Sequence, residues 1–201
     1  MESMFLVEYE DFFNYQLVES TSDSKGYYIR GVVSRAEKPN KNKRIYPKPV
    51  MEQAINEVAE AVKVGGFVGE VDHPASPKVN VDRISHKITK LELANDGAVL
   101  AEMVILDTPQ GIILKRLIDG GVKLGVSTRA IGGLKPYSGP LGEGYLEVQP
   151  GLKLKAIDVV FDPSAGDDGR PDFVTEGVTE NGIILGHTSK FEQVWDDIFG
   201  K

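Results

Sequence analysis

Three side chains in this 201-residue chain are of the types that together activate a serine: Ser127, His73 and Asp158. A serine hydroxyl is a poor nucleophile until a neighbouring imidazole takes its proton. A carboxylate on the far ring nitrogen fixes the tautomer of the imidazole and stabilises the imidazolium. Such trios occur in several chain orders on unrelated folds, so the order His–Ser–Asp is compatible with hydrolysis by a serine nucleophile.

Ser127 lies in the sequence LGVSTR, at residues 124–129. Gly125, two residues earlier, lets backbone approach closely. Arg129 occupies the position of the second glycine of a nucleophile elbow, which disfavours an α/β-hydrolase. Serine is common in strands, so Ser127 by itself indicates little.

Histidine is scarce in this chain, and His73 is the candidate base. It follows the apolar run 67–71 and precedes Pro74, where a strand gives way to a loop, and such edges often carry active-site residues. A single histidine of this kind is nevertheless more often structural than catalytic. His86 falls within a strand pattern, which favours a packed histidine, and His187 falls in the tail.

Asp158 interrupts an apolar run at residues 156–161, and an acid inside a strand needs a partner. Alternation along the strand could instead point it to solvent. Asp162 is a weaker candidate, because Asp-Pro-Ser is typical of a turn.

The composition limits the classes of protein that are possible. The chain has no cysteine, which excludes disulfides, thiolate nucleophiles and cysteine-ligated zinc. Its net charge of −7 disfavours nucleic-acid binding, and a basic group at residues 38–48 falls in a Pro/Asn-rich stretch typical of a solvated loop. No apolar run is long enough for a bilayer, so we expect no membrane partner.

The elements that must position these residues follow an α+β pattern. Strands are predicted from residue 26 onward, at 27–33, 67–71, 84–93, 98–106, 122–130, 144–148 and 152–161. Two helices are predicted, one with a buried face of Val50, Ala54, Val58 and Ala61 and one capped at 107–108 with a face of Ile112, Ile113, Leu117 and Ile118.

The predicted organisation is an N-terminal leader (1–25), one folded domain (26–166) and a C-terminal tail (167–201). The leader mixes aromatic residues with acids, which indicates that it docks rather than floats free. The tail ends in a short amphipathic helix, whose apolar stripe packs either on the domain or on a partner.

Four stretches, in this order and spacing, resemble the prohead core protein protease family of tailed phages. They are NKRIYP at 42–47, GEVDHP at 69–74, GVSTR at 125–129, and DVV at 158–160 followed by PSA at 163–165. The family is similar in fold to the herpesvirus assembly proteases. The resemblance therefore implies an antiparallel β-barrel flanked by helices.

By this resemblance, His73 is the general base, Ser127 the nucleophile and Asp158 the third member, with His86 as the fallback. Thr128 and Arg129 are expected to help hold the oxyanion or the substrate, with the backbone N–H of Arg129 foremost. No metal and no other cofactor is expected.

The resemblance also implies cleavage after glutamate in apolar-x-Glu sequences. The chain itself contains such sequences in its leader and tail, ending at Glu8, Glu19, Glu176 and Glu180. We therefore expect a self-inhibited zymogen that cuts its own leader, and whose substrates are the scaffold, core and capsid proteins. It would act inside the phage prohead in the host cytoplasm, as a homo-oligomer.

Two other functions compete with this one. A non-enzymatic capsid or tail protein built on the same barrel explains the strands and the terminal helix, but not the three chemical residues in matching motifs. A small-molecule esterase or amidase is disfavoured by the missing nucleophile elbow.

Overall fold

The computed structural model describes residues 4–10, 16–19, 27–72, 74, 76–160 and 198, with only the backbone at 7–10 and 16–19. Segments rich in β-branched and aromatic residues form its strands. The largest sheet has five antiparallel strands in the order β2-β3-β7-β6-β5. Their bounds are β2 Gln16–Glu19, β3 Tyr27–Arg35, β7 Ala98–Ile105, β6 Ile84–Leu93 and β5 Val68–Glu70.

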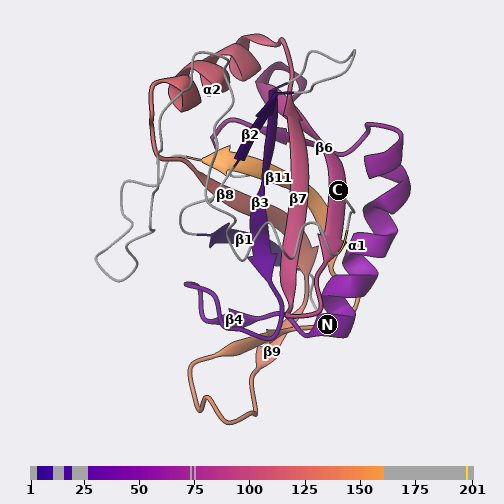
Figure 1. Ribbon diagram of the computed structural model, residues 1–201. Helices are drawn as coiled ribbons and strands as arrows, with labels where there is room; N and C mark the ends of the chain where they lie inside the picture. The colour runs from indigo at the N-terminus through magenta and orange to yellow at the C-terminus, as the bar shows by residue number, and fades with distance from the viewer. Residues whose placement is uncertain are drawn as a thin grey trace.

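A second sheet has the order β1-β8-β11 and is antiparallel throughout. Its strands are β1 Met4–Glu10, β8 Gly125–Gly132 and β11 Lys153–Val160. In Figure 1, β8 and β11 cross behind the long strands β3, β7 and β6. A third, small sheet joins β4 Arg44–Ile45, β10 Leu146–Val148 and β9 Leu134–Pro136.

The α+β prediction is confirmed, whereas a closed barrel is not shown. A barrel needs continuous pairing around a ring of strands. Among the described residues, the two larger sheets are joined by one parallel bridge, between Val71 after β5 and Val159 of β11. The expected likeness to the herpesvirus proteases therefore stays a prediction.

Both predicted helices are present. α1 spans Lys48–Lys63, with Pro47 at its N-cap and Pro49 in its first turn. The residues that it buries against the core are Val50, Met51, Ala54 and Ile55. α2 spans Pro109–Asp119, and the Thr108 hydroxyl caps it by accepting the Gly111 N–H at 3.1 Å. Its buried face is Gly111, Leu114 and Ile118. The predicted face of α2 was partly wrong, since Ile112 and Ile113 are exposed.

The buried face of α2 differs from the predicted one because the helix lies very close to its neighbours at Gly111. A Cβ on Gly111 would lie 1.9 Å from the Leu106 carbonyl oxygen, so the helix seats its glycine face inward. The periodic apolar pattern alone does not reveal such a contact.

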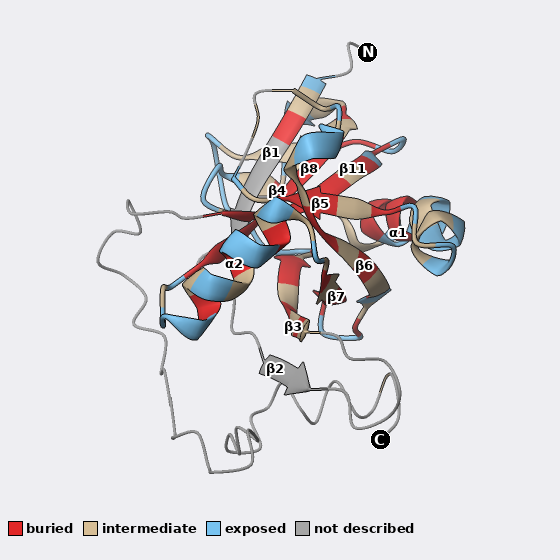
Figure 2. Cartoon of the chain, turned by 90° about the horizontal axis from the view of Figure 1, so that it is seen from above, coloured by how far each residue is buried: buried red, intermediate tan, exposed pale blue. Residues whose placement is uncertain are grey.

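One hydrophobic core lies between the two larger sheets and under the helices. Its members come from every layer, including Leu6 of β1, Ile88 of β6, Met103 of β7, Val126 of β8 and Ile157 of β11. Figure 2 shows the buried faces inside and the exposed faces of α1 and α2 outside. Leu6 is fully buried, so the leader strand contributes to the core.

A smaller cluster lies elsewhere, built from Ala94, Ala98 and Leu100, with Val32 packed against it. Ile198, the one described residue of the tail, is helical and packs on this cluster. This contact favours packing of the tail stripe on the domain. No helix of the described ranges is long and apolar enough to cross a membrane.

Candidate active site

Ser127 lies in the middle of β8, between a strand on either side. The residue is fully buried, and its Oγ has no hydrogen-bond partner within the part of the chain that the structure describes. Buried polar atoms are nearly always hydrogen-bonded, so an unpartnered hydroxyl calls for an explanation. A nucleophile held for use is one such explanation.

Asp158 is the direct cross-strand partner of Ser127, on β11. Directly opposite residues in an antiparallel pair project to the same face with their Cβ atoms about 4.5–5.5 Å apart. The carboxylate is fully buried, and its Oδ1 accepts the Glu70 backbone N–H at 3.0 Å. The expectation that Asp158 points to a partner rather than to solvent is therefore confirmed.

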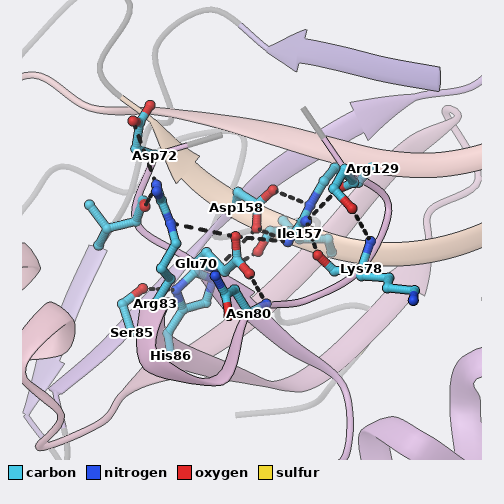
Figure 3. Close-up of polar contacts among 12 residues, drawn as sticks. Glu70, Asp72, Lys78, Asn80, Arg83, Ser85, His86, Arg129, Ile157 and Asp158 are labelled. Carbon is cyan, nitrogen blue, oxygen red and sulfur yellow. Dashed lines mark hydrogen bonds and ion pairs between the residues drawn. The ribbon is translucent and has the colours of Figure 1, made fainter. Parts of the chain in front are cut away.

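The partner that the structure gives Asp158 is Arg129 (Figure 3). Arg129 Nη2 donates to Asp158 Oδ1 at 3.0 Å. Arg129 Nε forms an ion pair with Asp158 Oδ2 at 2.6 Å, without hydrogen-bond geometry. The guanidinium is fully buried, so it is enclosed by the domain and does not line an open subsite for a substrate glutamate.

Glu70, at the end of β5, completes this cluster and was missed by sequence reasoning. It is fully buried, its Oε2 lies 3.4 Å from Arg129 Nη2, and its Oε1 accepts the Asn80 N–H. The signal was available, because an acid within the apolar run 67–71 needs a partner just as Asp158 does.

His73 lies outside the described residues, but the chain that leads into it is described. Val71 bridges Val159, and the Asp72 N–H donates to the Val159 carbonyl at 2.9 Å. Asp72 has a φ of 65°, a left-handed conformation that is uncommon for a non-glycine residue. The described chain therefore lies against β11 up to Asp72, at Val159, the residue that follows Asp158 on that strand.

His86 is placed differently from a triad member. It is fully buried; its Nδ1 lies 2.8 Å from Ser85 Oγ and its Nε2 lies 2.9 Å from the Ile157 carbonyl oxygen. A carbonyl only accepts, so Nε2 carries the proton and Nδ1 accepts from the serine. Burial lowers the pKa of His86 to about 4, opposed by the Ile157 carbonyl and by the Asp158 charge. Both ring nitrogens are thus engaged away from Ser127.

Thr128 turns its side chain away from the nucleophile. Its hydroxyl donates to the Val33 carbonyl of β3 at 3.3 Å. The side chains of Thr128 and Arg129 are therefore engaged elsewhere. The prediction that these residues hold an oxyanion now concerns only their backbone N–H groups.

The leader strand β1 runs antiparallel along the other edge of β8. Its register pairs Glu8 with Thr128 and Tyr9 with Ser127. The Glu8–Tyr9 peptide bond consequently lies across from the bond that joins Ser127 to Thr128. Glu19 lies in β2, paired with Tyr27 of β3. Asp162, Glu176 and Glu180 fall outside the described residues.

Within the described ranges, no three His, Asp or Glu residues are grouped so as to hold a metal ion. The described residues thus place a buried serine hydroxyl between β11, which carries Asp158, and β1. Such a hydroxyl is a candidate nucleophile, and its predicted base, His73, lies outside the described residues.

Comparison with known proteins identifies the family. The model of the family described as "Prohead core protein serine protease" matches residues 14–181. The chain therefore belongs to the prohead core protein serine protease family and is a peptidase of phage prohead maturation.

Two relatives agree with this assignment. The chain is similar to the prohead core protein protease of Enterobacteria phage T4, with 36% identity over 160 residues, covering 77% of this chain and 73% of the relative. Its fold is similar to the solved structure of the bacteriophage T4 capsid assembly protease. That match has a TM-score of 0.73 and 26% identity, over 81% of this chain and 100% of the other.

Proposed function

We propose that the chain is a serine endopeptidase in which Ser127 is the nucleophile and His73 the base. His73 takes the Ser127 proton while Oγ attacks the scissile carbonyl carbon, giving a tetrahedral intermediate. The intermediate collapses, the C–N bond breaks, and His73 returns the proton to the leaving amine. Water then hydrolyses the acyl-enzyme by the same route and restores Ser127. The observation that carries this proposal is the buried, unpartnered Ser127 hydroxyl opposite Asp158.

Asp158 is proposed as the residue that orients His73. An ionised carboxylate has about four acceptor sites. Arg129 and the Glu70 N–H are two of the donors that face it, and the imidazole N–H of His73 is proposed as another. In this role the guanidinium keeps Asp158 ionised and fixed, and the carboxylate in turn holds the ring. Successive N–H groups of a strand point to opposite neighbours, so the N–H of Thr128 or Arg129 that faces β1 is the proposed oxyanion donor.

The proposed substrate is a chain cut after glutamate in an apolar-x-Glu sequence, and the leader is its internal example. Leu6, Val7 and Glu8 form such a sequence, and the β1 register supports the Glu8–Tyr9 bond as the one presented to Ser127. A basic subsite is proposed to bind the substrate glutamate, with Arg129, Lys123 or the basic group at 41–44 as its possible source. The Arg129 side chain is enclosed, so Lys123 and the group at 41–44 are the proposed candidates.

Self-inhibition is proposed on the same geometry. Ser127 is fully buried while β1 pairs along β8, so a substrate strand must displace β1 to reach it. Cleavage after Glu8 or Glu19 would release the strand, and cleavage after Glu176 would release the tail. Leu6 packs in the core, so leader release also carries a cost in stability.

The proposed setting is the interior of the prohead in the host cytoplasm, with scaffold, core and capsid proteins as substrates. These assignments rest on the family and on the printed names of the T4 relatives. A homo-oligomer remains part of the proposal.

The test is cleavage of a peptide copying residues 4–12 by the full chain and by Ser127→Ala, with labelling by a fluorophosphonate. Loss of a serine nucleophile lowers kcat by at least about 10³-fold. Ser34→Ala, another buried serine, is the matched control. Cleavage by Ser127→Ala at the wild-type rate contradicts the serine mechanism. If the wild type neither cuts nor is labelled once incubation for self-cleavage has ended, the serine mechanism is contradicted.

A further inference from the structure

The Arg129 side chain holds more of the chain than its salt bridge to Asp158. Its Nη1 donates to the Ser76 carbonyl at 3.0 Å and to the Lys78 carbonyl at 3.2 Å. Its Nε and Nη2 face Asp158, and Nη2 also faces Glu70 at 3.4 Å. A fully buried charge is tolerated only when it is paired and hydrogen-bonded, which is the case here.

These contacts hold both ends of the segment between Glu70 and Asn80. On the near side, the Glu70 N–H donates to Asp158, which Arg129 holds. On the far side, Arg129 holds Ser76 and Lys78 directly, and Glu70 accepts the Asn80 N–H (Figure 3). The segment therefore starts and ends on the same buried ion cluster, and the cluster is attached to β8 two residues after Ser127.

A second arginine supports the start of this segment. Arg83 donates to the Val71 carbonyl at 3.0 Å, and lies 3.6 Å from Asp72 Oδ2 and 3.9 Å from Glu70 Oε2. Arg83 is partly exposed, whereas Arg129 and Glu70 are fully buried. Arg129 is thus the member that links the strand of the nucleophile to the whole segment.

We infer that Arg129 is a positioning residue, which fixes the 70–80 segment relative to β8 and thereby sets where His73 stands beside Ser127. This inference rests on the proposed roles of Ser127 and His73. It assigns the Arg129 side chain to the geometry of the catalytic groups, not to the substrate or the oxyanion.

The guanidinium is suited to this task in a way that lysine is not. Arginine presents five donors in a rigid planar fork, while lysine presents a compact ammonium on a flexible stem. Arg129 uses this fork in two directions, toward two carbonyls and toward two carboxylates. Arg129→Lys keeps the charge and loses the two-sided geometry, so it separates charge from position.

The experiment compares kcat and KM of the full chain for the peptide of residues 4–12, after self-cleavage has reached its end point by intact mass. Small displacements of catalytic groups can lower rates by about 10²-fold. We expect Arg129→Lys to lower kcat by about that factor and to leave KM within about twofold, because the Arg129 side chain does not contact the substrate. Arg129→Met should lower kcat at least as much.

Arg30→Met is the matched control for general loss of an ion pair. Arg30 pairs with Glu102 within the five-stranded sheet, with Nη2 2.7 Å and Nε 2.8 Å from Oε2. Thermal unfolding is measured for all variants, and rates are compared below the lowest midpoint. If Arg129→Met does not fold, Arg129→Lys decides the question.

The inference is overturned if Arg129→Lys lowers kcat no more than Arg30→Met does, or if it raises KM as much as it lowers kcat. Ser127→Ala separates this failure from failure of the proposed function. An inactive Ser127→Ala beside a fully active Arg129→Lys overturns only the positioning role. A fully active Ser127→Ala overturns the proposed function itself.

Discussion

The two strands that pair with β8 place different groups beside Ser127. On one side β11 brings Asp158 and, through it, a buried cluster of two acids and an arginine. On the other side β1 brings a peptide strand from the leader, with Tyr9 opposite Ser127. The first neighbour is linked to the rest of the fold by buried charges. The second is the strand that, in the proposed function, a substrate displaces. In that proposal the catalytic groups lie on the β11 side of β8 and the leader strand lies on the other.

The largest effect is expected on the β11 side, from Asp158→Asn. This change keeps the shape but removes the charge that faces Arg129, and loss of the orienting acid of a serine triad lowers kcat by about 10⁴-fold. Asp158→Ala should in addition lower the free energy of unfolding by about 3–5 kcal/mol, because Arg129 would remain buried without its main partner. Peptide cleavage rates and urea unfolding measure the two effects.

Asp96→Asn, an exposed acid in the turn between β6 and β7, is the control. An Asp158→Asn variant that retains the wild-type kcat would remove β11 from the chemistry and leave it a purely structural neighbour.

The next effect is expected on the β1 side, from Leu6→Ala. Truncation of a fully buried leucine costs about 2–5 kcal/mol, and here the loss falls on the strand that covers Ser127. We expect faster fluorophosphonate labelling of Ser127 together with a lower unfolding midpoint. Leu114→Ala, on the buried face of α2, should lower the midpoint without faster labelling. Equal labelling of the two variants would mean that β1 is a fixed core strand.

A smaller effect is expected from His86, which joins β6 to β11 through the Ile157 carbonyl. Its pKa in the folded chain is about 4, below the unfolded value of about 6.5. Protonation therefore favours the unfolded chain, and stability is lost as pH falls below 6.5 toward 4, by up to about 3 kcal/mol.

This contribution is measured as the difference in free energy of unfolding between wild type and His86→Gln across pH 7 to 4. The wild type should lose more stability than the variant. Parallel curves would show that His86 does not remain neutral while it anchors β11.

The smallest effect is expected from Gly69→Ala, where β5 passes over β11. A Cβ at this position would lie 1.8 Å from the Ile157 carbonyl oxygen and 2.3 Å from His86 Nε2. Such overpacking costs about 1–3 kcal/mol and should shift the segment that leads to His73. Gly66→Ala, whose nearest contact would be 3.6 Å, is the control, and thermal unfolding compares the two. Equal midpoints would show that β5 and β11 can separate freely.

The sequence predicted the parts of the fold that follow local patterns. The helices at α1 and α2 and the hairpin of β6 and β7 were found because periodicity, caps and an Asn-Asp-Gly turn are local signals. The face of α2 was misjudged, because a tight contact at Gly111 overrides the apolar pattern. β1 and β2 were read only as a docking leader. The pairing of β1 with β8 depends on a partner far along the chain, whereas β2 pairs with the next strand, β3, and was passed over.

The candidate site was predicted by residue type but not by contact. Asp158 was singled out because a buried acid needs a partner, yet the partner that the structure gives is Arg129, which sequence reasoning had assigned to the oxyanion or the substrate. Glu70 obeyed the same rule and was passed over. Long-range pairing of charges from β5, β8 and β11 is set by the tertiary fold, and no local spacing encodes it. The roles of Ser127 and His73 remain predictions.

The most direct test of the central claim is the intact mass of the purified full chain followed over time, beside Ser127→Ala. The account predicts that the wild type loses fragments ending at Glu8 or Glu19, while Ser127→Ala keeps its full mass under the same conditions. Identical fragments from both proteins, or cuts that follow residues other than glutamate, would contradict it.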